Sequence, residues 1–187
     1  MRIVAGDYGG RKLKAVPGMK TRPTTDKVKE AMFNILGPYF DGGLSLDLFA
    51  GSGGLSIEAV SRGLTHAYLV DRQYQAIKTI HENIAVTKEP EKFTVFKGDA
   101  KKMLTKFSEE KLKFDYVFLD PPYKKQEITL LLEQFIQKEI LADAAIIVCE
   151  TDQDADLPTK LAEYTCFKQA DYGITKLTFY CYQTKKG

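Results

Sequence analysis

The stretch Leu46-Asp47-Leu48-Phe49-Ala50-Gly51-Ser52-Gly53-Gly54 runs from an apolar strand pattern directly into glycine. In doubly wound α/β folds, ligands bind at the carboxyl ends of the strands, and glycines there let a ligand approach the backbone where the next helix begins. The stretch therefore predicts a small-molecule site. The third glycine of the dinucleotide fingerprint would fall at position 56, which is Ser56, and this weakens the case for a pyrophosphate cradle.

From residue 44 onward, strand patterns alternate with helical patterns, which is typical of stacked βαβ units and a mostly parallel sheet. We predict strands at 44–49, 67–71, 93–98, 114–120 and 144–150, and helices near 54–63, 73–87, 101–108 and 126–138. Two further β-rich runs, 165–172 and 175–182, are separated by Gly173-Ile174 and predict a terminal antiparallel hairpin. The expected fold class is α/β and Rossmann-like, with a mostly parallel seven-stranded sheet that ends in this hairpin. The last of the four helices shows the clearest apolar stripe, formed by Ile128, Leu131, Leu132, Phe135 and Ile136.

The beginning of the chain is basic. Residues 2–5 and 11–16 read as two short strands joined by a glycine-containing turn, and a helix with an apolar stripe at Val28, Met32, Ile35 and Leu36 ends near Gly37-Pro38. The first 30 residues carry eight cationic and three acidic side chains, a net charge of +5, whereas the remainder of the chain carries −3. This asymmetry is expected of a protein that binds a polyanion, because neutralised phosphates release counterions. Charge alone fits a solvated hairpin equally well.

The composition excludes several classes of protein. A chain of 187 residues with 44% hydrophobic and 28% charged residues is typical of one globular domain rather than a disordered chain. Its apolar runs are shorter than the ~20 residues of a membrane-spanning helix, and no leader pattern opens it, so we expect a cytoplasmic protein. The three cysteines, Cys149, Cys166 and Cys181, and the two isolated histidines, His66 and His81, predict neither disulfides nor a metal site.

Two acidic residues at predicted strand ends suggest how a ligand is held. Asp71 lies 20 residues beyond Gly51, the spacing at which an acidic side chain binds a ribose diol. This favours an adenosine-type ligand, either NAD or S-adenosylmethionine. Asp99 closes the third strand and is expected to bind an adenine amino group or to cap the following helix.

The fourth strand decides between these cofactors. It is followed by Asp120-Pro121-Pro122-Tyr123, which is a polar residue, two prolines and an aromatic residue. An amine conjugated to a nucleobase is a poor nucleophile, and Asp120 and the Pro121 carbonyl are acceptors that could orient its nitrogen toward a methyl sulfonium. The prolines fix the backbone, and Tyr123 offers a face on which an extruded base could stack. The structural alternative is a proline-rich turn between strand and helix.

These motifs together resemble the class I S-adenosylmethionine-dependent methyltransferases that modify exocyclic amines. The segments Arg2-Ile3-Val4-Ala5-Gly6, Gly10-Arg11-Lys12-Leu13 and Thr21-Arg22-Pro23-Thr24-Thr25-Asp26 are similar to the N-terminal signature of the RsmD family, bacterial 16S rRNA (guanine-N2)-methyltransferases. The resemblance covers the chain end to end. It implies methyl transfer to N2 of a guanine in 16S rRNA, within a small-subunit particle, with S-adenosylmethionine as cofactor and no metal.

The resemblance also implies roles for individual residues and for the two parts of the chain. Residues 1–37 would form a basic hairpin and docking helix that contacts RNA and covers the cleft, and residues 38–187 the methyltransferase domain. The implied catalytic residues are Asp120, Pro121, Pro122 and Tyr123. The expected cofactor-binding residues are Asp47, Phe49, Gly51, Ser52, Gly53, Asp71, Arg72, Asp99 and Ala100. The expected RNA-binding residues are Arg2, Arg11, Lys12, Arg22, Thr24 and Lys124.

Other functions are less favoured. An adenine-N6 DNA methyltransferase would use the same tetrad but usually needs additional sequence for target recognition. A glutamine-N5 protein methyltransferase typically carries Asn where this chain has Asp120. An NAD-dependent oxidoreductase is disfavoured by Ser56 and by the tetrad, and a non-catalytic RNA-binding module would not keep both the glycines and the tetrad.

Overall fold

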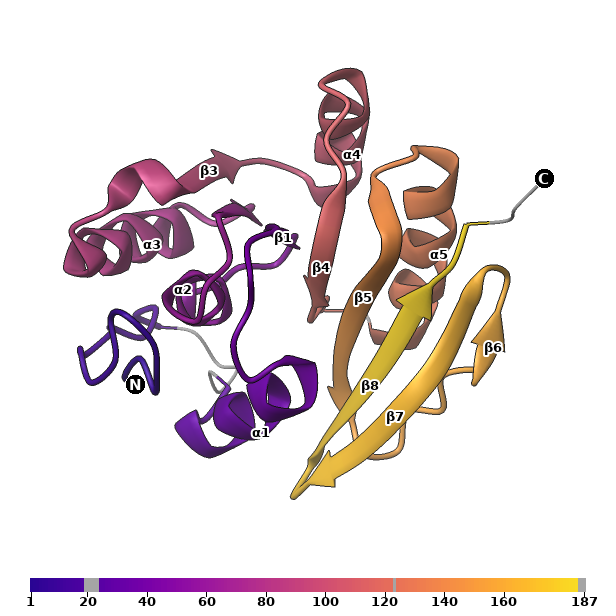
Figure 1. Ribbon diagram of the computed structural model, residues 1–187, viewed down its shortest axis with the longest axis horizontal. Helices are drawn as coiled ribbons and strands as arrows, with labels where there is room; N and C mark the ends of the chain where they lie inside the picture. Colours follow the sequence, from indigo (N-terminus) through magenta and orange to yellow (C-terminus); the bar gives the residue numbers. More distant parts are fainter. Residues whose placement is uncertain (19–23, 123, 185–187) are drawn as a thin grey trace. The chain divides into compact units, whose positions relative to one another are not determined.

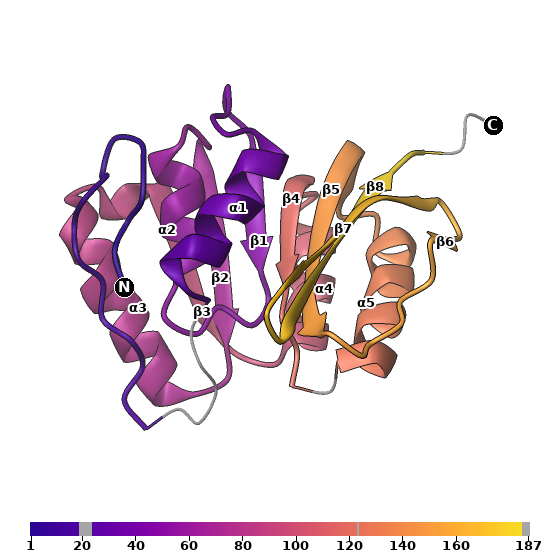
Figure 2. The same cartoon turned by 90° about the horizontal axis from the view of Figure 1, so that it is seen from below.

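The computed structural model describes residues 1–18, 24–122 and 124–184, with the backbone alone at 124–126. The chain divides into two compact units, residues 1–99 and 100–187. Figures 1 and 2 together label the α-helices and strands of both.

Among its described residues, the first unit has three parallel strands and three α-helices. The strands are β1 (Leu44–Asp47), β2 (His66–Asp71) and β3 (Phe93–Lys97), in the order β3-β2-β1. The helices are α1 (Asp26–Leu36), α2 (Gly54–Ser61) and α3 (Tyr74–Thr87), and a short 3-10 helix, η1 (Pro90–Lys92), precedes β3. The register pairs Asp47 with Leu69 and Asp71 with Lys97, so the strands end at one edge. The predicted alternation of strands and helices is confirmed here, with ends that differ by one to two residues.

The predicted N-terminal hairpin is not a pair of strands. Residues 1–16, which we call the N-terminal arm, form a single antiparallel bridge between Arg2 and Lys12. The arm's chain does fold back on itself, because the Ile3 N–H donates to the Arg11 carbonyl at 2.9 Å. A continued ladder is prevented because neighbouring backbone groups bond to side chains of α2 and α3 instead.

Three apolar side chains of the arm belong to the core of the first unit. Ile3, Tyr8 and Leu13 are buried in one cluster with residues of α2, α3 and the parallel strands. Gly6 permits this close packing, since a Cβ there would lie 1.9 Å from the Ser61 carbonyl oxygen and its φ is +88°. The arm is therefore a packed layer on the first unit.

Helix α1 buries a face that overlaps the predicted one but is rotated from it. Thr25 caps it by accepting from the Val28 N–H at 3.2 Å. The buried side chains are Lys29, Met32, Phe33 and Leu36, whereas Val28 and Ile35 are only half-buried. The predicted stripe is confirmed at Met32 and Leu36 and wrong at Val28 and Ile35. The shift arises because Lys29 is drawn inward by a buried carboxylate described below.

The second unit joins one parallel strand pair to an antiparallel end (Figure 2). Its elements are α4 (Ala100–Glu109), β4 (Phe114–Leu119), α5 (Lys124–Gln137), β5 (Leu141–Asp152), β6 (Lys160–Leu161), β7 (Tyr164–Tyr172) and β8 (Thr175–Tyr182). The strand order is β4-β5-β8-β7-β6, with β4 parallel to β5 and every later pair antiparallel. The terminal hairpin is confirmed, and the two-residue β6 adds one strand that the sequence pattern did not predict.

The core of the second unit lies beneath α5. Four residues of the predicted stripe, Ile128, Leu131, Leu132 and Phe135, have no exposed surface. The Tyr164 hydroxyl donates to the Leu132 carbonyl at 2.6 Å and ties β7 to this helix. The stripe prediction is therefore confirmed except for Ile136, which is half-buried.

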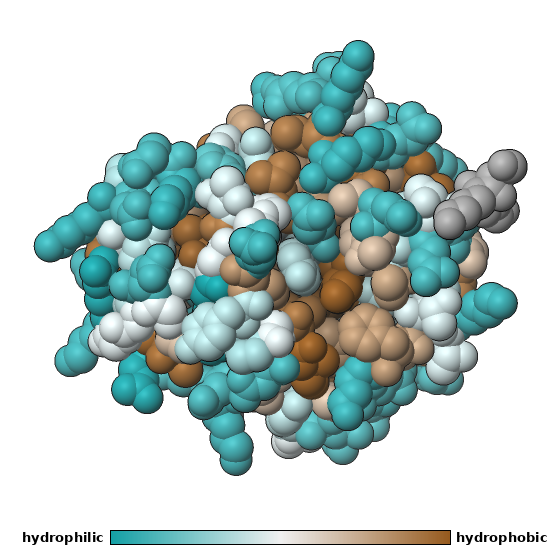
Figure 3. Space-filling model, in the orientation of Figure 1, coloured by the Kyte–Doolittle hydropathy of each residue, from teal (hydrophilic) through white to brown (hydrophobic). Residues whose placement is uncertain are grey.

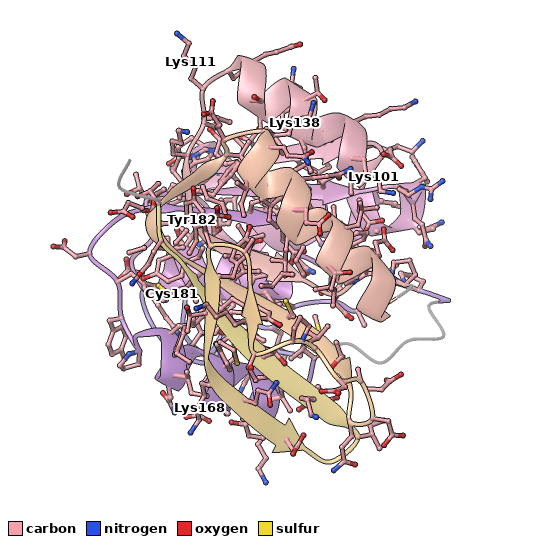
Figure 4. All side chains as sticks on the ribbon, turned by 90° about the vertical axis from the view of Figure 1, so that its right-hand side faces the viewer. Lys101, Lys111, Lys138, Lys168, Cys181 and Tyr182 are labelled. Carbon is pink, nitrogen blue, oxygen red and sulfur yellow. The ribbon has the colours of Figure 1, made fainter. Side chains whose placement is uncertain are left out.

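The face of the molecule in Figure 3 is largely hydrophilic. Hydrophilic side chains surround smaller hydrophobic patches on the face in Figure 3, and lysines such as Lys111 and Lys168 extend from the second unit in Figure 4. No helix among the described residues is long and apolar enough to cross a membrane. The three cysteines are free; Cys149 is buried, whereas Cys166 and Cys181 are half-buried rather than core residues.

Candidate functional site

The loop between β1 and α2, residues 48–53, is built from local hydrogen bonds and two left-handed glycines. We call it the glycine loop. Asp47 closes β1 and accepts from the Phe49 N–H at 3.1 Å, and the Gly53 N–H donates to the Ala50 carbonyl at 2.8 Å. Gly51 has φ +57° and Gly53 has φ +83°, conformations that cost other residues about 1–2 kcal/mol each.

The two glycines serve different purposes. A Cβ on Gly53 would lie 3.2 Å from Leu69 Cδ2, so this glycine allows α2 to approach β2. A Cβ on Gly51 would meet no atom within 4 Å. The backbone at Gly51 therefore faces open space, which is what a site for a bound ligand requires.

Asp71 lies directly beside this open backbone. Its Oδ2 accepts from the Gly51 N–H at 2.9 Å, and its Oδ1 accepts from the Gln73 N–H at 2.9 Å. These two bonds hold the carboxylate at the end of β2, and each oxygen retains a lone pair for another donor. The spacing of 20 residues in the sequence thus becomes a direct contact between the acid and the glycine loop.

These residues fit an adenosyl cofactor better than a pyrophosphate. A ribose diol supplies two hydroxyl donors, which match the carboxylate oxygens of Asp71. The segment 46–56 contains no lysine or arginine that would neutralise a phosphate. The Asp71 carboxylate and the absence of cationic side chains in this segment therefore favour a ligand that has a ribose but no phosphates.

The remaining predicted cofactor residues differ in exposure. Asp47 is buried, Phe49, Ser52 and Asp99 are half-buried, and Arg72 is exposed. Asp99 is the last residue of the first unit, and Ala100 is the buried first residue of α4 in the second unit.

The predicted tetrad belongs to the second unit. β4 ends at Leu119, which pairs with Cys149 of β5, so Asp120 and Pro121 follow the carboxyl end of a parallel strand. Asp120 and Pro122 are exposed and Pro121 is buried, whereas Tyr123 lies outside the described residues. Lys124 opens helix α5. An exposed carboxylate between a buried strand and a fixed proline is a suitable acceptor for an amine of a substrate.

The cationic side chains of the arm that we predicted to bind RNA differ in how far other groups of the protein already bind them. The Arg11 guanidinium donates to the Val86 and Thr87 carbonyls, both at 3.1 Å, and lies 5.4 Å from the centre of the Tyr8 ring. It therefore stabilises the carboxyl end of α3, where free carbonyls favour a cation. Lys12 is exposed and forms no ion pair within the described part of the chain.

The other predicted RNA-binding residues lie around α1. Arg2 is exposed and 3.8 Å from the Asp26 carboxylate. Thr24 is half-buried just before α1, and Arg22 lies outside the described residues. Arg2 and Lys12 face each other across the single bridge of the arm.

A second polar cluster flanks Tyr8. Its hydroxyl donates to Glu89 at 2.9 Å, and burial raises the pKa of this phenol above its ordinary value of 10.0. Hydrogen bonds from Lys92 and Tyr8 lower the pKa of Glu89 below 4.5. With Glu89 ionised, the cluster anchors the arm to the segment between α3 and η1.

Sequence reasoning missed Glu58, which has four polar partners among the described residues of the first unit. Glu58 is fully buried on α2 and accepts from the Val4 and Ala5 N–H groups at 2.8 and 3.1 Å. It also accepts from Arg62 Nε at 2.7 Å, and Lys29 Nζ lies 3.3 Å away. A usable signal existed, because Glu58 interrupts an apolar helix and has an arginine four residues later.

Ser61 and Asn83 were also missed, and both bind the arm. The Ser61 hydroxyl donates to the Ala5 carbonyl at 2.6 Å and accepts from the Tyr8 N–H at 3.0 Å. Asn83 bonds to both backbone groups of Lys14. These contacts join residues more than 50 positions apart, so no local pattern reveals them.

Solved structures share this fold. The structure described as "Putative methyltransferase yhhF from Escherichia coli" is 30% identical and superposes with a TM-score of 0.84, covering 99% of each chain. A "putative sam-dependent methyltransferase from Streptococcus mutans" is 14% identical, with a TM-score of 0.72 over 86% of this chain and 49% of that one, and shows the fold alone. The fold is that of the α/β methyltransferases.

Relatives in sequence extend over nearly the whole chain. The Bacillus subtilis protein named "Putative rRNA methyltransferase YlbH" is 44% identical over 180 residues, 96% of this chain and 98% of its own. The Escherichia coli K12 protein named "Ribosomal RNA small subunit methyltransferase D" is 31% identical, over 96% of this chain and 89% of its own. The family model described as "Conserved hypothetical protein 95" matches residues 1–181. The chain belongs to this family, the RsmD family, as its N-terminal signature predicted.

Proposed function

We propose that this protein transfers a methyl group from S-adenosylmethionine to the exocyclic N2 of a guanine in 16S rRNA, in a small-subunit particle in the cytoplasm. The observation that carries the proposal is the Asp71 carboxylate fixed beside the open backbone of Gly51. The proposal is also supported by the family of the chain, since its Escherichia coli relative is named a ribosomal RNA small subunit methyltransferase.

The first unit holds the cofactor in this proposal. Asp71 accepts hydrogen bonds from the ribose hydroxyls, and the Gln73 and Gly51 amides keep its carboxylate in place. The backbone of the glycine loop lies against the cofactor where a side chain would obstruct it. When bound, S-adenosylmethionine supplies an electrophilic methyl group, so the protein must provide alignment and charge stabilisation rather than a strong base.

The tetrad of the second unit holds the acceptor amine. Asp120 and the Pro121 carbonyl accept the N–H groups of guanine N2, which directs the nitrogen lone pair toward the methyl group. As this nitrogen formed its bond to the methyl carbon, the sulfur–methyl bond would break and S-adenosylhomocysteine would leave with the electron pair. The Asp120 carboxylate would stabilise the positive charge that develops on the nitrogen. The proton leaves late, to Asp120 or to water. Tyr123 stacks on the extruded base.

The basic beginning of the chain, residues 1–37, binds the RNA backbone in this proposal. Lys12 is favoured as a phosphate contact because it is exposed and forms no ion pair with the described residues. Arg11 is favoured as a structural cation because two helix carbonyls occupy its guanidinium. Replacing Lys12 by Ala should weaken RNA binding and reduce its dependence on salt, whereas Arg11→Ala should mainly lower stability.

The function is tested by transfer of isotope-labelled methyl groups from S-adenosylmethionine. Small ribosomal subunits that lack the modification, naked 16S rRNA and duplex DNA are compared, and the product is identified by nucleoside mass spectrometry. N2-methylguanosine in rRNA supports the proposal. N6-methyladenine in DNA would retain the methyl-transfer chemistry and refute the substrate, and label in none of the three would refute the activity.

Two variants separate the proposed roles. Asp71→Asn should weaken binding of S-adenosylhomocysteine, measured by calorimetry without RNA. Asp120→Ala should leave that affinity within about twofold and lower turnover by about 10²-fold or more, the size typical of a lost electrostatic contact in a transition state. Equal loss of affinity and turnover in Asp120→Ala would make Asp120 a binding residue instead.

A further inference from the structure

One side chain contacts both the N-terminal arm and the glycine loop. Asn83 lies on α3 and is 1% exposed. Its Nδ2 donates to the Ser52 carbonyl at 2.8 Å and to the Lys14 carbonyl at 2.9 Å, and its Oδ1 accepts from the Lys14 N–H at 2.8 Å. Both amide protons are used, one on each segment.

The hydrogen bond from Asn83 to the Ser52 carbonyl is made between the two positive-φ glycines of the glycine loop. The Ser52 carbonyl belongs to the peptide group that joins Ser52 to Gly53, and the glycines on both sides of Ser52, Gly51 and Gly53, have positive φ. Glycine places few steric limits on the backbone, so the orientation of this peptide depends on hydrogen bonds. Asn83 supplies the bond on the carbonyl side, while Asp71 accepts the Gly51 N–H two peptides earlier.

Other contacts place the arm against the same part of the molecule. Met1 Sδ lies 3.9 Å from the Ser52 hydroxyl oxygen. Glu58, on the helix that follows the glycine loop, accepts from Val4 and Ala5. The arm is thus bonded to the loop, to α2 and to α3, and the Asn83 side chain hydrogen-bonds to both the arm and the loop.

We propose that Asn83 is a positioning residue that couples the N-terminal arm to the cofactor loop, so that binding of cofactor and binding of RNA strengthen each other. This inference rests on the proposed function. Ordering the loop around a cofactor fixes the Ser52 peptide, which fixes the Asn83 amide and with it the backbone of Lys14. Coupling between two binding sites is reciprocal, so RNA held by the arm must raise cofactor affinity by the same factor.

Two variants on α3 separate coupling from simple attachment of the arm. Asn83→Asp keeps the size of the side chain and an acceptor for the Lys14 N–H, but it places a carboxylate oxygen where the donor to two carbonyls stood. Glu82→Gln is the matched control. Glu82 bonds to Lys14 Nζ at 3.3 Å from the same helix, and among the described residues it forms no hydrogen bond or ion pair with the glycine loop. If Asn83→Asp is too unstable to purify, Asn83→Ser removes the bridge with a smaller change of charge.

The first measurement follows amide hydrogen exchange of residues 2–16 with and without S-adenosylhomocysteine, in the absence of RNA. We expect the cofactor product to slow exchange of the arm about threefold or more in the wild-type protein and in Glu82→Gln, and to leave it unchanged in the Asn83 variants. An arm that does not respond in the wild-type protein, or that responds equally in Asn83→Asp, overturns the inference. Failure of the wild-type protein to bind S-adenosylhomocysteine would instead refute the proposed function.

The second measurement compares the affinity for S-adenosylhomocysteine with and without small ribosomal subunits that lack the modification. We expect subunits at saturating concentration to tighten binding of S-adenosylhomocysteine about fivefold or more, within the usual range for coupled sites. Asn83→Asp should reduce this factor to about one, whereas Glu82→Gln should retain it. A factor of one in the wild-type protein, with both ligands bound, would overturn the coupling and leave the proposed function intact.

Discussion

The buried carboxylate of Glu58 provides a sharp test of how the arm is held. Substitution Glu58→Gln conserves the shape of the side chain and removes its charge. Lys29 and Arg62, whose side chains are only 3% and 2% exposed, then lose their buried anionic partner. The new amide group also brings a donor toward the Val4 and Ala5 N–H groups, which need an acceptor.

The expected loss is large because the ion pairs are inaccessible to water. Removing one partner of a buried pair costs about 3–5 kcal/mol, since the remaining charge is left uncompensated. For a chain of this size each kcal/mol lowers the melting temperature by about 2–4 °C, so we expect a decrease of about 6–20 °C. The matched control is Glu110→Gln, which breaks an exposed pair with Lys106 and should cost less than about 0.5 kcal/mol.

Urea unfolding followed by far-UV circular dichroism and tyrosine fluorescence measures both losses. The chain has ten tyrosines and no tryptophan, so tyrosine is the fluorescent probe. A double variant, Glu58→Gln with Lys29→Met, should recover part of the loss because it removes one unpaired cation. A loss below about 1 kcal/mol in Glu58→Gln, or no recovery in the double variant, would refute this account of the network.

Three further predictions follow from single contacts. Burial lowers the pKa of His66 below its ordinary value of 6.5, so near this pH the unfolded chain binds more protons than the folded protein. The free energy of unfolding should therefore fall as the pH drops below about 6.5. His66→Gln should flatten this pH dependence, measured by urea unfolding. Tyr164→Phe removes the buried bond to the Leu132 carbonyl and should cost about 1–3 kcal/mol, and an unchanged urea midpoint would show that this bond contributes nothing. Gly53→Ala must adopt φ +83° with its Cβ 3.2 Å from Leu69, so it should cost at least about 1 kcal/mol in a thermal melt, and an equal or higher melting temperature would contradict the assignment.

The order of elements and much of the site could be predicted because their signals are local. Strands and helices were predicted from hydrophobic periodicity, which reflects the face that each element buries. Gly51, Gly53 and Asp71 could be singled out because a tight turn needs glycine and because the length of a βα unit fixes the spacing to the next strand end.

The errors have a common physical cause. The arm lacks the predicted strands because side chains of α2 and α3, rather than the facing strand, satisfy its backbone groups. The stripe of α1 was misplaced at Val28 and Ile35 because Lys29, a charged residue, is buried against Glu58. In both cases a partner distant in sequence overrides a local preference.

The sequence by itself determined the family, the succession of strands and helices, the glycine loop with its acidic partner, and the tetrad after the fourth strand. Only the tertiary structure decided that Arg11 supports a helix end, that Glu58 holds the arm, and that Asn83 joins the arm to the glycine loop. The reason is that turns and periodicity depend on neighbours along the chain, whereas a buried polar group takes whichever partner the fold brings within hydrogen-bonding distance.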